Sequence, residues 1–343
     1  RNNLGAALAE LGELDQAAAV FQTIIQSRGD DADAHVNYAQ TLLTRGQFQR
    51  GWAEYEWRLK RVSLAWPYTQ PQWTGEDLAG KTILLRSEQG LGDTIQFIRF
   101  APMPAQGGAI VLLRCPPELT RLVTGMPGIK GLVPMDQPPP LCEFQCPLLS
   151  LPFVLGTELP SIPTAVPYLV PEPALVRAWR EKLDMHGQGF RVGLVWAGTA
   201  LHKNDRNRSL PLRGLSAMAA IANVLYVSLQ VGAPAAQLAA PPAGMKIVDV
   251  GTQLTDFADT AAVIANLDLV ITVDTAVAHM AGAMGKPVWT LLSKVADWRW
   301  LLDREDSPWY PTMRLFRQKT RGDWAELMGR VAAALAEIRK NEE

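Results

Sequence analysis

The residues whose types and spacing best suit chemistry follow a short apolar run in the C-terminal third of the chain. Residues 267–273 are rich in β-branched side chains, which predicts a strand buried on both faces. Asp274 and Thr275 follow as helix-capping residue types, before small apolar residues that predict a closely packed helix. The backbone N–H groups of Thr275, Ala276 and Val277 would be free at the positive end of the helix dipole. Such a turn can bind phosphate, although any well-capped strand–turn–helix unit shows the same pattern.

A cationic loop is the second candidate. Residues 196–209 follow a predicted strand and hold Lys203, Arg206 and Arg208 in an otherwise neutral chain. These cations could neutralise a bound anion such as phosphate, and the Thr199 hydroxyl could donate a hydrogen bond to it. A solvated charged loop is the alternative interpretation, and Arg206 and Arg208 require no more than that.

Residues 90–93 form a Gly-Leu-Gly-Asp turn between the predicted strand 81–85 and the predicted helix 93–101. Asp93 with Gln96 three residues later is a variant of the capping box, so Asp93 could simply cap the helix. The same carboxylate would also lie at the mouth of a first strand-to-helix turn, where open parallel sheets bind ligands.

Three further residues are candidates for contacts with a sugar or a nucleotide. Gln230 ends the predicted strand 224–229, at a carboxyl edge suited to nucleotide contacts. His279 lies one turn into the helix after Thr275, where simple packing is the alternative. Gly92 belongs to the turn that contains Asp93.

Two α/β regions position these residues. Strands are predicted at 81–85, 109–113, 131–133, 191–195, 224–229, 246–250, 267–273 and 288–292. Segments rich in Trp and Pro beyond Trp298 are typical of a loop over the site, and residues 323–340 predict a closing amphipathic helix.

The first sixty residues repeat. With an offset of about 34 residues, the tetratricopeptide period, Gly12 aligns with Gly46 and Phe21 with Tyr55. This predicts two helix–turn–helix repeats that serve in packing or in binding a protein partner. Because about three repeats are usually needed for stability, we expect that more precede Arg1 or that these two dock on the next domain.

Composition excludes several classes of protein. The 343 residues are 48% hydrophobic and 20% charged, and the net charge of −1 argues against a general nucleic-acid binder. Cys142 and Cys146 have no second ligand pair, so we expect buried thiols in a reducing compartment rather than a metal site. We find no apolar run of the roughly 18 residues that a spanning helix needs, and no signal peptide. These features predict a cytoplasmic protein without a membrane span.

The run from Asp274 to Trp289 closely resembles the donor-site signature of the heptosyltransferase-like glycosyltransferases. The resemblance extends from Trp66 to about Ile338, and the whole chain looks like the bacterial repeat proteins that carry such a domain. It implies an α/β fold of GT-B architecture, with two Rossmann-like domains behind an all-α segment of tetratricopeptide repeats. The expected boundaries are 1–62 for the repeats, 63–80 for a linker, 81–170 for an N-terminal acceptor domain, 171–318 for a C-terminal nucleotide-sugar domain and 319–343 for the closing helix.

The resemblance also implies roles for individual residues. In the family, the Asp-Thr turn and the amides after it hold the diphosphate of a nucleotide-sugar, and a Thr and a Lys of the cationic loop contact phosphate. These positions are Asp274 to Val277, Thr199 and Lys203 here. The Asp of the Gly-Asp turn, here Asp93, is proposed to deprotonate the acceptor hydroxyl. One departure is Ala276, where typical members have Gly; its methyl group narrows the approach of the phosphate.

The implied activity is transfer of a sugar from a nucleotide-sugar to a hydroxyl of a glycan, lipid-linked or protein acceptor, with inversion and without metal or cofactor. Two alternatives remain. One is a tetratricopeptide scaffold whose transferase-like domain has lost turnover. The other is a nucleotide-sugar 2-epimerase, which we expect to need additional acid/base carboxylates and histidines that the sequence does not show.

Overall fold

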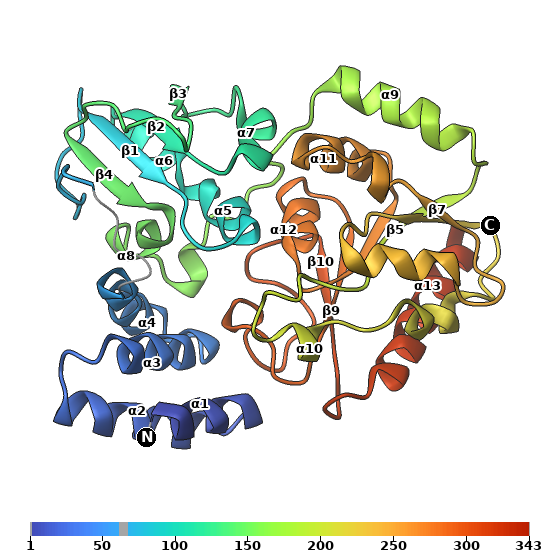
Figure 1. Ribbon diagram of the computed structural model, residues 1–343, viewed down its shortest axis with the longest axis horizontal. Coiled ribbons are helices and arrows are strands. Elements are labelled where there is room, and N and C mark those ends of the chain that lie inside the picture. Colours follow the sequence, from blue (N-terminus) through green and yellow to red (C-terminus); the bar gives the residue numbers. More distant parts are fainter. Residues whose placement is uncertain (1, 62–67, 343) are drawn as a thin grey trace. The chain divides into compact units, whose positions relative to one another are not determined.

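The structure is a computed structural model that describes residues 2–61 and 68–342 (Figure 1). It divides into two compact units, each of which carries one parallel sheet. The first unit comprises the chain up to Pro117, Thr124–Thr164 and Val295–Arg304, and the second comprises Glu118–Val123, Ala165–Lys294 and the chain from Glu305 onward. The predicted linker lies partly outside the described residues, as does Trp66, the expected start of the family resemblance.

Four helices form the N-terminal part of the first unit, drawn in blue in Figure 1. They are α1 (Asn2–Leu11), α2 (Leu14–Ser27), α3 (Ala32–Thr44) and α4 (Phe48–Tyr55), and a short 3-10 helix follows at Glu56–Lys60. Gly12 and Gly46 have positive φ angles at the two turns, where the sequence predicts them. A Cβ on Gly5 would lie 2.5 Å from the Phe21 ring, so a side chain there would force α1 away from α2. The helix–turn–helix pairs are therefore present, while their assignment as tetratricopeptide repeats stays a prediction.

The sheet of the first unit has the strand order β3-β2-β1-β4, with all pairs parallel. Its strands are β1 (Thr82–Arg86), β2 (Ile110–Arg114), β3 (Gly131–Leu132) and β4 (Phe144–Pro147). Its helices are α5 (Leu91–Phe97), α6 (Pro102–Gln106) and α8 (Leu151–Val154), while α7 (Pro117–Val123) lies almost entirely in the residues assigned to the second unit. Since β1 is flanked by β2 and β4, the turn that follows β1 opens at the centre of the carboxyl edge.

The sheet of the second unit has the strand order β10-β9-β8-β5-β6-β7, again parallel throughout. The strands are β5 (Phe190–Val195), β6 (Val224–Ser228), β7 (Ile247–Asp249), β8 (Leu269–Val273), β9 (Val288–Leu292) and β10 (Met313–Arg317). The helices are α9 (Pro173–Asp184), α10 (Asp205–Arg208), α11 (Phe257–Ala265), α12 (Ala276–Ala283) and α13 (Trp324–Glu342). This is the doubly wound order of Rossmann folds, and its direction reverses between β5 and β8. Ligands of such sheets bind at that switch point.

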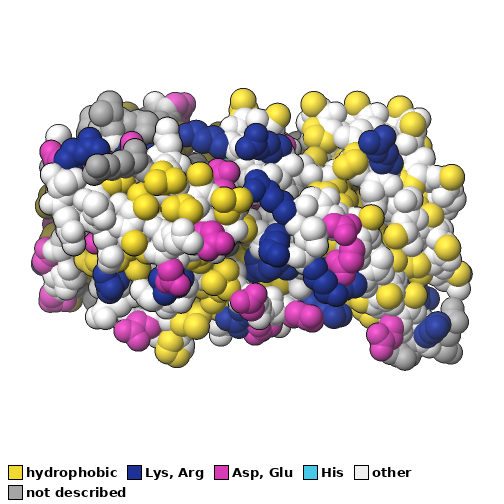
Figure 2. All heavy atoms as spheres, turned by 90° about the horizontal axis from the view of Figure 1, so that it is seen from below, with side chains coloured by type: hydrophobic (Ala, Val, Ile, Leu, Met, Phe, Trp, Pro, Cys, Tyr) yellow, Lys and Arg dark blue, Asp and Glu magenta, His cyan; other side chains and the backbone are white. Residues whose placement is uncertain are grey.

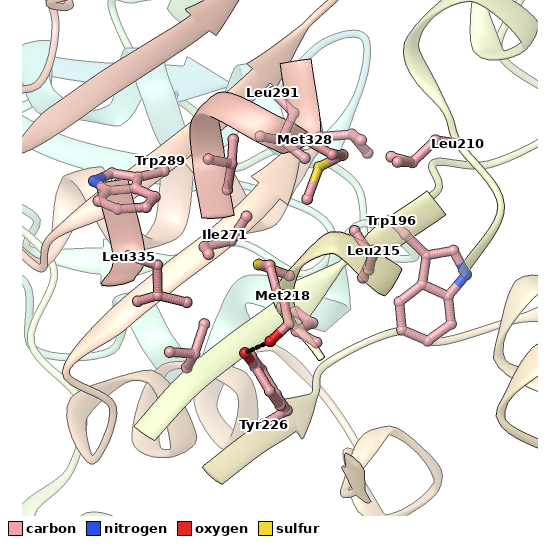
Figure 3. Packing of buried hydrophobic residues seen from close by; sticks show 14 of the residues in the cluster. Trp196, Leu210, Leu215, Met218, Tyr226, Ile271, Trp289, Leu291, Met328 and Leu335 are labelled. Atoms are coloured by element: carbon pink, nitrogen blue, oxygen red, sulfur yellow. Dashed lines mark hydrogen bonds between the residues drawn. The ribbon is translucent and has the colours of Figure 1, made fainter. Parts of the chain in front are cut away.

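The core of the second unit packs α13 against one face of the sheet (Figure 3). Met328 and Leu335 of α13 meet Ile271 and Leu291 of the sheet, and all four side chains are buried. Burial of such side chains contributes about 1.5–3 kcal/mol each, so the amphipathic helix predicted for the C-terminal region is an integral part of the unit.

Several features differ from the sequence-based prediction, among them β10, which was not predicted. β4 was not predicted, because four residues that end in a proline after a Pro-rich run carry too little pattern. α9 was missed for a similar reason, since prolines crowd the residues before it. The Trp-rich segment Val295–Arg304 belongs to the first unit, where Trp298 and Trp300 are buried, while its role as a loop over the site stays a prediction.

The charges match a near-neutral protein. On the face drawn in Figure 2, Lys and Arg side chains are interspersed with Asp and Glu and with apolar side chains. Among the described helices, none has the length and hydropathy required to cross a membrane.

Candidate active site

The turn between β8 and α12 offers backbone N–H groups. Thr275 is the N-cap residue and has an extended backbone, with φ −143° and ψ 174°, as predicted. Its hydroxyl does not cap the helix, because it pairs with the Thr272 hydroxyl at 3.1 Å. Ala278 N donates to Thr275 O at 3.0 Å, whereas the N–H groups of Thr275, Ala276 and Val277 have no acceptor among the described residues. The geometry therefore leaves an anion-binding turn at the carboxyl end of β8.

Small residues bury α12 against its neighbours. A Cβ on Gly282 would lie 2.5 Å from the Tyr310 ring, so this glycine permits the close approach. His279 is 5% exposed, and its Nδ1 lies 2.9 Å from the Tyr310 hydroxyl. The structure thus favours the packing role of His279 over the predicted contact with sugar or phosphate.

Arg208 connects the cationic loop to this turn. Its Nη1 donates to the carbonyl oxygen of Asp274 at 2.9 Å, and its Nε donates to Asp205 Oδ1 at 3.3 Å. A Cβ on Gly198 would collide with the same guanidinium. Gly198 N donates to Ser209 Oγ at 2.9 Å, which closes the two ends of the loop on each other. The loop after β5 and the turn after β8 therefore meet at the switch point.

The sequence left Arg208 either as a cation for a diphosphate or as a solvated side chain, and neither interpretation included its hydrogen bond to Asp274. The sequence signal for this contact was a glycine at the start of the loop, Gly198, together with an arginine at its end, Arg208.

Gln230 anchors the loop from the next strand. Its Oε1 accepts from the backbone nitrogens of Trp196 at 3.1 Å and Ala197 at 3.0 Å. Its Nε2 donates to the carbonyl oxygens of Ala197 and Val231, both at 3.0 Å. The side chain is 3% exposed, and these four bonds commit its donors and occupy its acceptor oxygen. Gln230 therefore has a structural role that fixes the start of the loop, and its predicted nucleotide contact stays a prediction.

Lys203 and Thr199 are exposed in the same loop. Lys203 has no ion-pair or hydrogen-bond partner among the described residues. Thr199 Oγ1 accepts from Leu201 N at 3.3 Å, which leaves its proton available. Both side chains are accessible to a ligand, and their predicted phosphate contacts stay predictions.

Asp93 lies in the first unit, at the turn after β1. The helix begins earlier than predicted: Gly90 is the N-cap residue, and Asp93 occupies the third helical position. Asp93 Oδ2 accepts from Gly90 N at 2.8 Å, which is the reciprocal half of a capping box. Asp93 Oδ1 pairs with Arg299, and Gln96, the predicted partner in the box, instead accepts from Arg299 Nε at 2.6 Å. Gly92 is half-buried within the same helical turn.

A buried ion pair fixes the loop before Asp93. Glu88 is 3% exposed and accepts from Arg58 Nη2 at 2.5 Å, and Arg58 is 1% exposed. The neighbouring Tyr55 hydroxyl accepts from Gln89 Nε2 at 3.0 Å. Burial raises the pKa of Tyr55, although Arg299 and Arg58 oppose that effect, so Tyr55 stays a neutral phenol at this site.

Metal ligands are not clustered in the described part of the chain, where no three His, Cys, Asp or Glu side chains lie close enough to share an ion. All three cysteines are free thiols, and burial raises the pKa of Cys146. Metal independence itself stays a prediction.

Comparisons with known proteins agree with the geometry. Residues 221–317 match the family model described as glycosyltransferase family 9 (heptosyltransferase), a range that includes β8 and α12. Protein FlbA of Caulobacter vibrioides is 29% identical over 381 residues, and the match covers 98% of this chain and 61% of FlbA. The chain thus spans about three fifths of the length of that relative.

Two solved structures share the fold. One is the glycosyl transferase family 9 structure from Veillonella parvula, with a TM-score of 0.54 and 12% identity over 72% of this chain and 88% of that chain. The other is ADP-heptose LPS heptosyltransferase II of E. coli, with a TM-score of 0.54 and 13% identity over 76% and 99%. Residues 221–317, which include the turn after β8, are therefore similar to glycosyltransferase family 9 (heptosyltransferase), and the chain shares the fold of these two structures.

Proposed function

We propose that the chain is an inverting, metal-independent glycosyltransferase that moves a sugar from a nucleotide-sugar to an acceptor hydroxyl. The observation that carries the proposal is the switch point of the second sheet, where the N–H groups at the start of α12 meet the cationic loop. In this assignment, residues 171–318 bind the donor and residues 81–170 bind the acceptor, in a GT-B arrangement.

The donor diphosphate binds the N–H groups of Thr275, Ala276 and Val277, with Lys203 and Thr199 on its other side. The helix end contributes roughly half a positive charge, and pre-oriented N–H donors stabilise a developing anion at no cost in reorganisation. The negative charge that develops on the leaving diphosphate is therefore stabilised by N–H groups that already point at it. No divalent cation is needed for that step.

Asp93 acts as the general base. Its two oxygens accept one hydrogen bond each from Gly90 and Arg299, and a carboxylate has about four acceptor positions. The side chain is 20% exposed, so an acceptor hydroxyl can reach a remaining position. At about 2.6–3.2 Å from that hydroxyl, the carboxylate removes the proton as oxygen attacks the anomeric carbon from the face opposite the diphosphate.

The N-terminal helices are assigned as tetratricopeptide repeats that bind a protein partner or a protein acceptor. We infer a cytoplasmic location, which the free thiols and the proposed nucleotide-sugar donor support.

A second candidate is a scaffold without turnover. It is favoured by one observation, the ion pair between Asp93 and Arg299, which a purely structural carboxylate would also make. Donor binding and turnover separate the two functions.

The test is a binding panel of ADP, UDP, GDP and CDP and their sugars, followed by thermal unfolding and calorimetry. A nucleotide at 100 times its dissociation constant should stabilise the protein by about 2.7 kcal/mol. Lys203→Ala should weaken diphosphate binding by roughly 1.5–3 kcal/mol, because it removes a charged hydrogen bond. Arg206→Ala removes the same charge from the same loop, and Lys246→Ala removes an exposed cation beside the amino end of β7, so both should change affinity less.

Absence of binding to every nucleotide would favour the scaffold. Equal losses for Lys203→Ala and Arg206→Ala would show a general electrostatic effect and remove the specific contact.

A further inference from the structure

Arg299 is a buried cation beside the candidate base. It is 7% exposed and lies in the segment Val295–Arg304, which follows β9 in the chain but packs in the first unit with Asp93. Burying an unpaired charge costs several kcal/mol, so a buried arginine is kept only with well-placed partners. Its contacts therefore indicate what it does.

Three polar side chains hold the guanidinium. Nη2 donates to Asp93 Oδ1, Nε donates to Gln96 Oε1 at 2.6 Å, and Nη1 donates to Asp297 Oδ1 at 2.8 Å. Burial alone would lower the pKa of Arg299, but Asp297 and Asp93 outweigh burial and raise it. The group is therefore a permanent cation with a fixed orientation.

Aromatic packing fixes the segment itself. The guanidinium carbon of Arg299 lies 4.2 Å from the centre of the Trp298 ring. Trp298 in turn packs edge-on against Trp52 of α4, with 5.4 Å between the ring centres. Trp52 is 1% exposed and donates from Nε1 to the carbonyl oxygen of Thr157 at 3.0 Å. The N-terminal helices thus hold Arg299 through Trp298.

Asp93 is restrained from two sides. Gly90 N binds Oδ2, and Arg299 binds Oδ1. The first contact comes from the helix's own N-cap, whereas the second comes from a segment more than 200 residues later in the chain. Without Arg299, the carboxylate could turn about its side-chain bonds while keeping the Gly90 contact.

We infer that Arg299 is the positioning residue of Asp93, which orients the carboxylate toward the acceptor hydroxyl without touching substrate. The inference rests on the proposed role of Asp93 as general base. A misplacement of about 1 Å at a reacting group can cost 10²-fold in rate, so loss of this contact should lower kcat by about that factor. Donor affinity should not change, because Asp93, Gln96 and Asp297, which hold Arg299, belong to the first unit, whereas the proposed diphosphate contacts belong to the second.

The experiment compares Arg299→Lys and Arg299→Gln with Arg191→Lys as the control. Arg191 is also a buried, ion-paired arginine, 9% exposed and bound to Asp184, but it belongs to the second unit, whereas Asp93 belongs to the first. Crystal structures of the variants report the position of the Asp93 side chain. Kinetics uses whichever nucleotide-sugar of the panel is hydrolysed, in the parent and in the Asp93→Asn background.

Two results are expected. The Asp93 carboxylate leaves its position in the Arg299 variants and keeps it in Arg191→Lys. The Arg299 variants lose about 10²-fold in kcat with an unchanged KM for the donor, and they lose nothing further in the Asp93→Asn background, since the two residues act as a unit. Arg299→Lys keeps the positive charge beside Asp93 and Asp297, so this variant should fold even if Arg299→Gln does not.

If the Asp93 side chain stays in place in both Arg299 variants, the inference is overturned. This structural result does not depend on finding a nucleotide-sugar that the protein hydrolyses. Losses that multiply in the double variants also overturn it, because they assign Arg299 a separate structural effect. If Asp93→Asn keeps full turnover, the base assignment fails and the inference fails with it. If Asp93→Asn is inactive while Arg299→Lys is not, only the inference fails.

Discussion

Replacing Gln230 by Ala tests whether the cationic loop is held by one side chain. The substitution removes four hydrogen bonds of 3.0–3.1 Å that fix the backbone at Trp196, Ala197 and Val231. A typical bond contributes about 0.5–1.5 kcal/mol net, so four of them contribute roughly 2–6 kcal/mol if they add. A water molecule in the vacated space could make two to four of these bonds again and would bring the loss to the low end.

The assay combines thermal unfolding, hydrogen exchange and calorimetry. Gln230→Ala should lower stability and speed exchange in residues 196–209, because the start of the loop loses its anchor. It should also weaken diphosphate binding, since Lys203 is carried by that loop. The control is Gln237→Ala. Gln237 is exposed, and its side chain accepts a hydrogen bond from Leu212 N at 2.7 Å, so this variant should lose less than about 1.5 kcal/mol of stability.

One result would refute this reasoning. If Gln230→Ala keeps its stability and the slow exchange of the loop but loses nucleotide affinity, then Gln230 touches the nucleotide. The nucleotide contact predicted for Gln230 from its position at the end of the strand would then be supported, and the structural role would be wrong.

Two further predictions concern stability. Gly282→Ala should destabilise the protein by about 1–3 kcal/mol, because the added methyl group would collide with the Tyr310 ring. The control is Gly329→Ala in α13, where the space is open and the substitution should stabilise the helix by up to about 1 kcal/mol. If the two variants had equal melting temperatures, the packing of α12 would be contradicted. Burial opposes the charge of Asp259, but hydrogen bonds led by that from Thr255 outweigh it and lower its pKa. The carboxylate therefore stabilises the fold above its unfolded pKa near 3.8 and loses that contribution as pH falls through the folded value, so Asp259→Asn should flatten the acid limb of the stability curve.

Local pattern predicted the donor-side turn, while long-range contacts stayed out of reach. The apolar run before Asp274 and the capping residue types after it determine a strand, an N-cap and a helix by short-range physics. The turn predicted there is present, with Thr275 as the N-cap. By contrast, the boundary at Asp93 was wrong by three residues, because a glycine can serve as N-cap and leave the acidic residue at the third position.

The missed contacts share a physical reason. Arg299 lies 206 residues from Asp93, and Arg208 lies 66 residues from Asp274. Charged side chains carry no periodic signal that pairs them across such separations, so only the folded strand order brings them together. The strand order itself decides which loops meet, and short strands such as β4 enter it almost without a sequence pattern.

In the proposed donor site, the charge balance at the switch point favours Lys203 as the cation that binds the diphosphate. Arg208 is paired with Asp205 and bonded to the carbonyl oxygen of Asp274, so its charge already serves the fold of the loop. A diphosphate brings several negative charges, and the helix end at Thr275 offers only about half a positive charge. The remaining positive charge has to come from exposed cations of the same loop, of which Lys203 is one without a partner among the described residues. Binding should therefore weaken as salt screens this exposed charge, in the parent more steeply than in Lys203→Ala. A salt dependence that is identical in both proteins would place the diphosphate away from this loop.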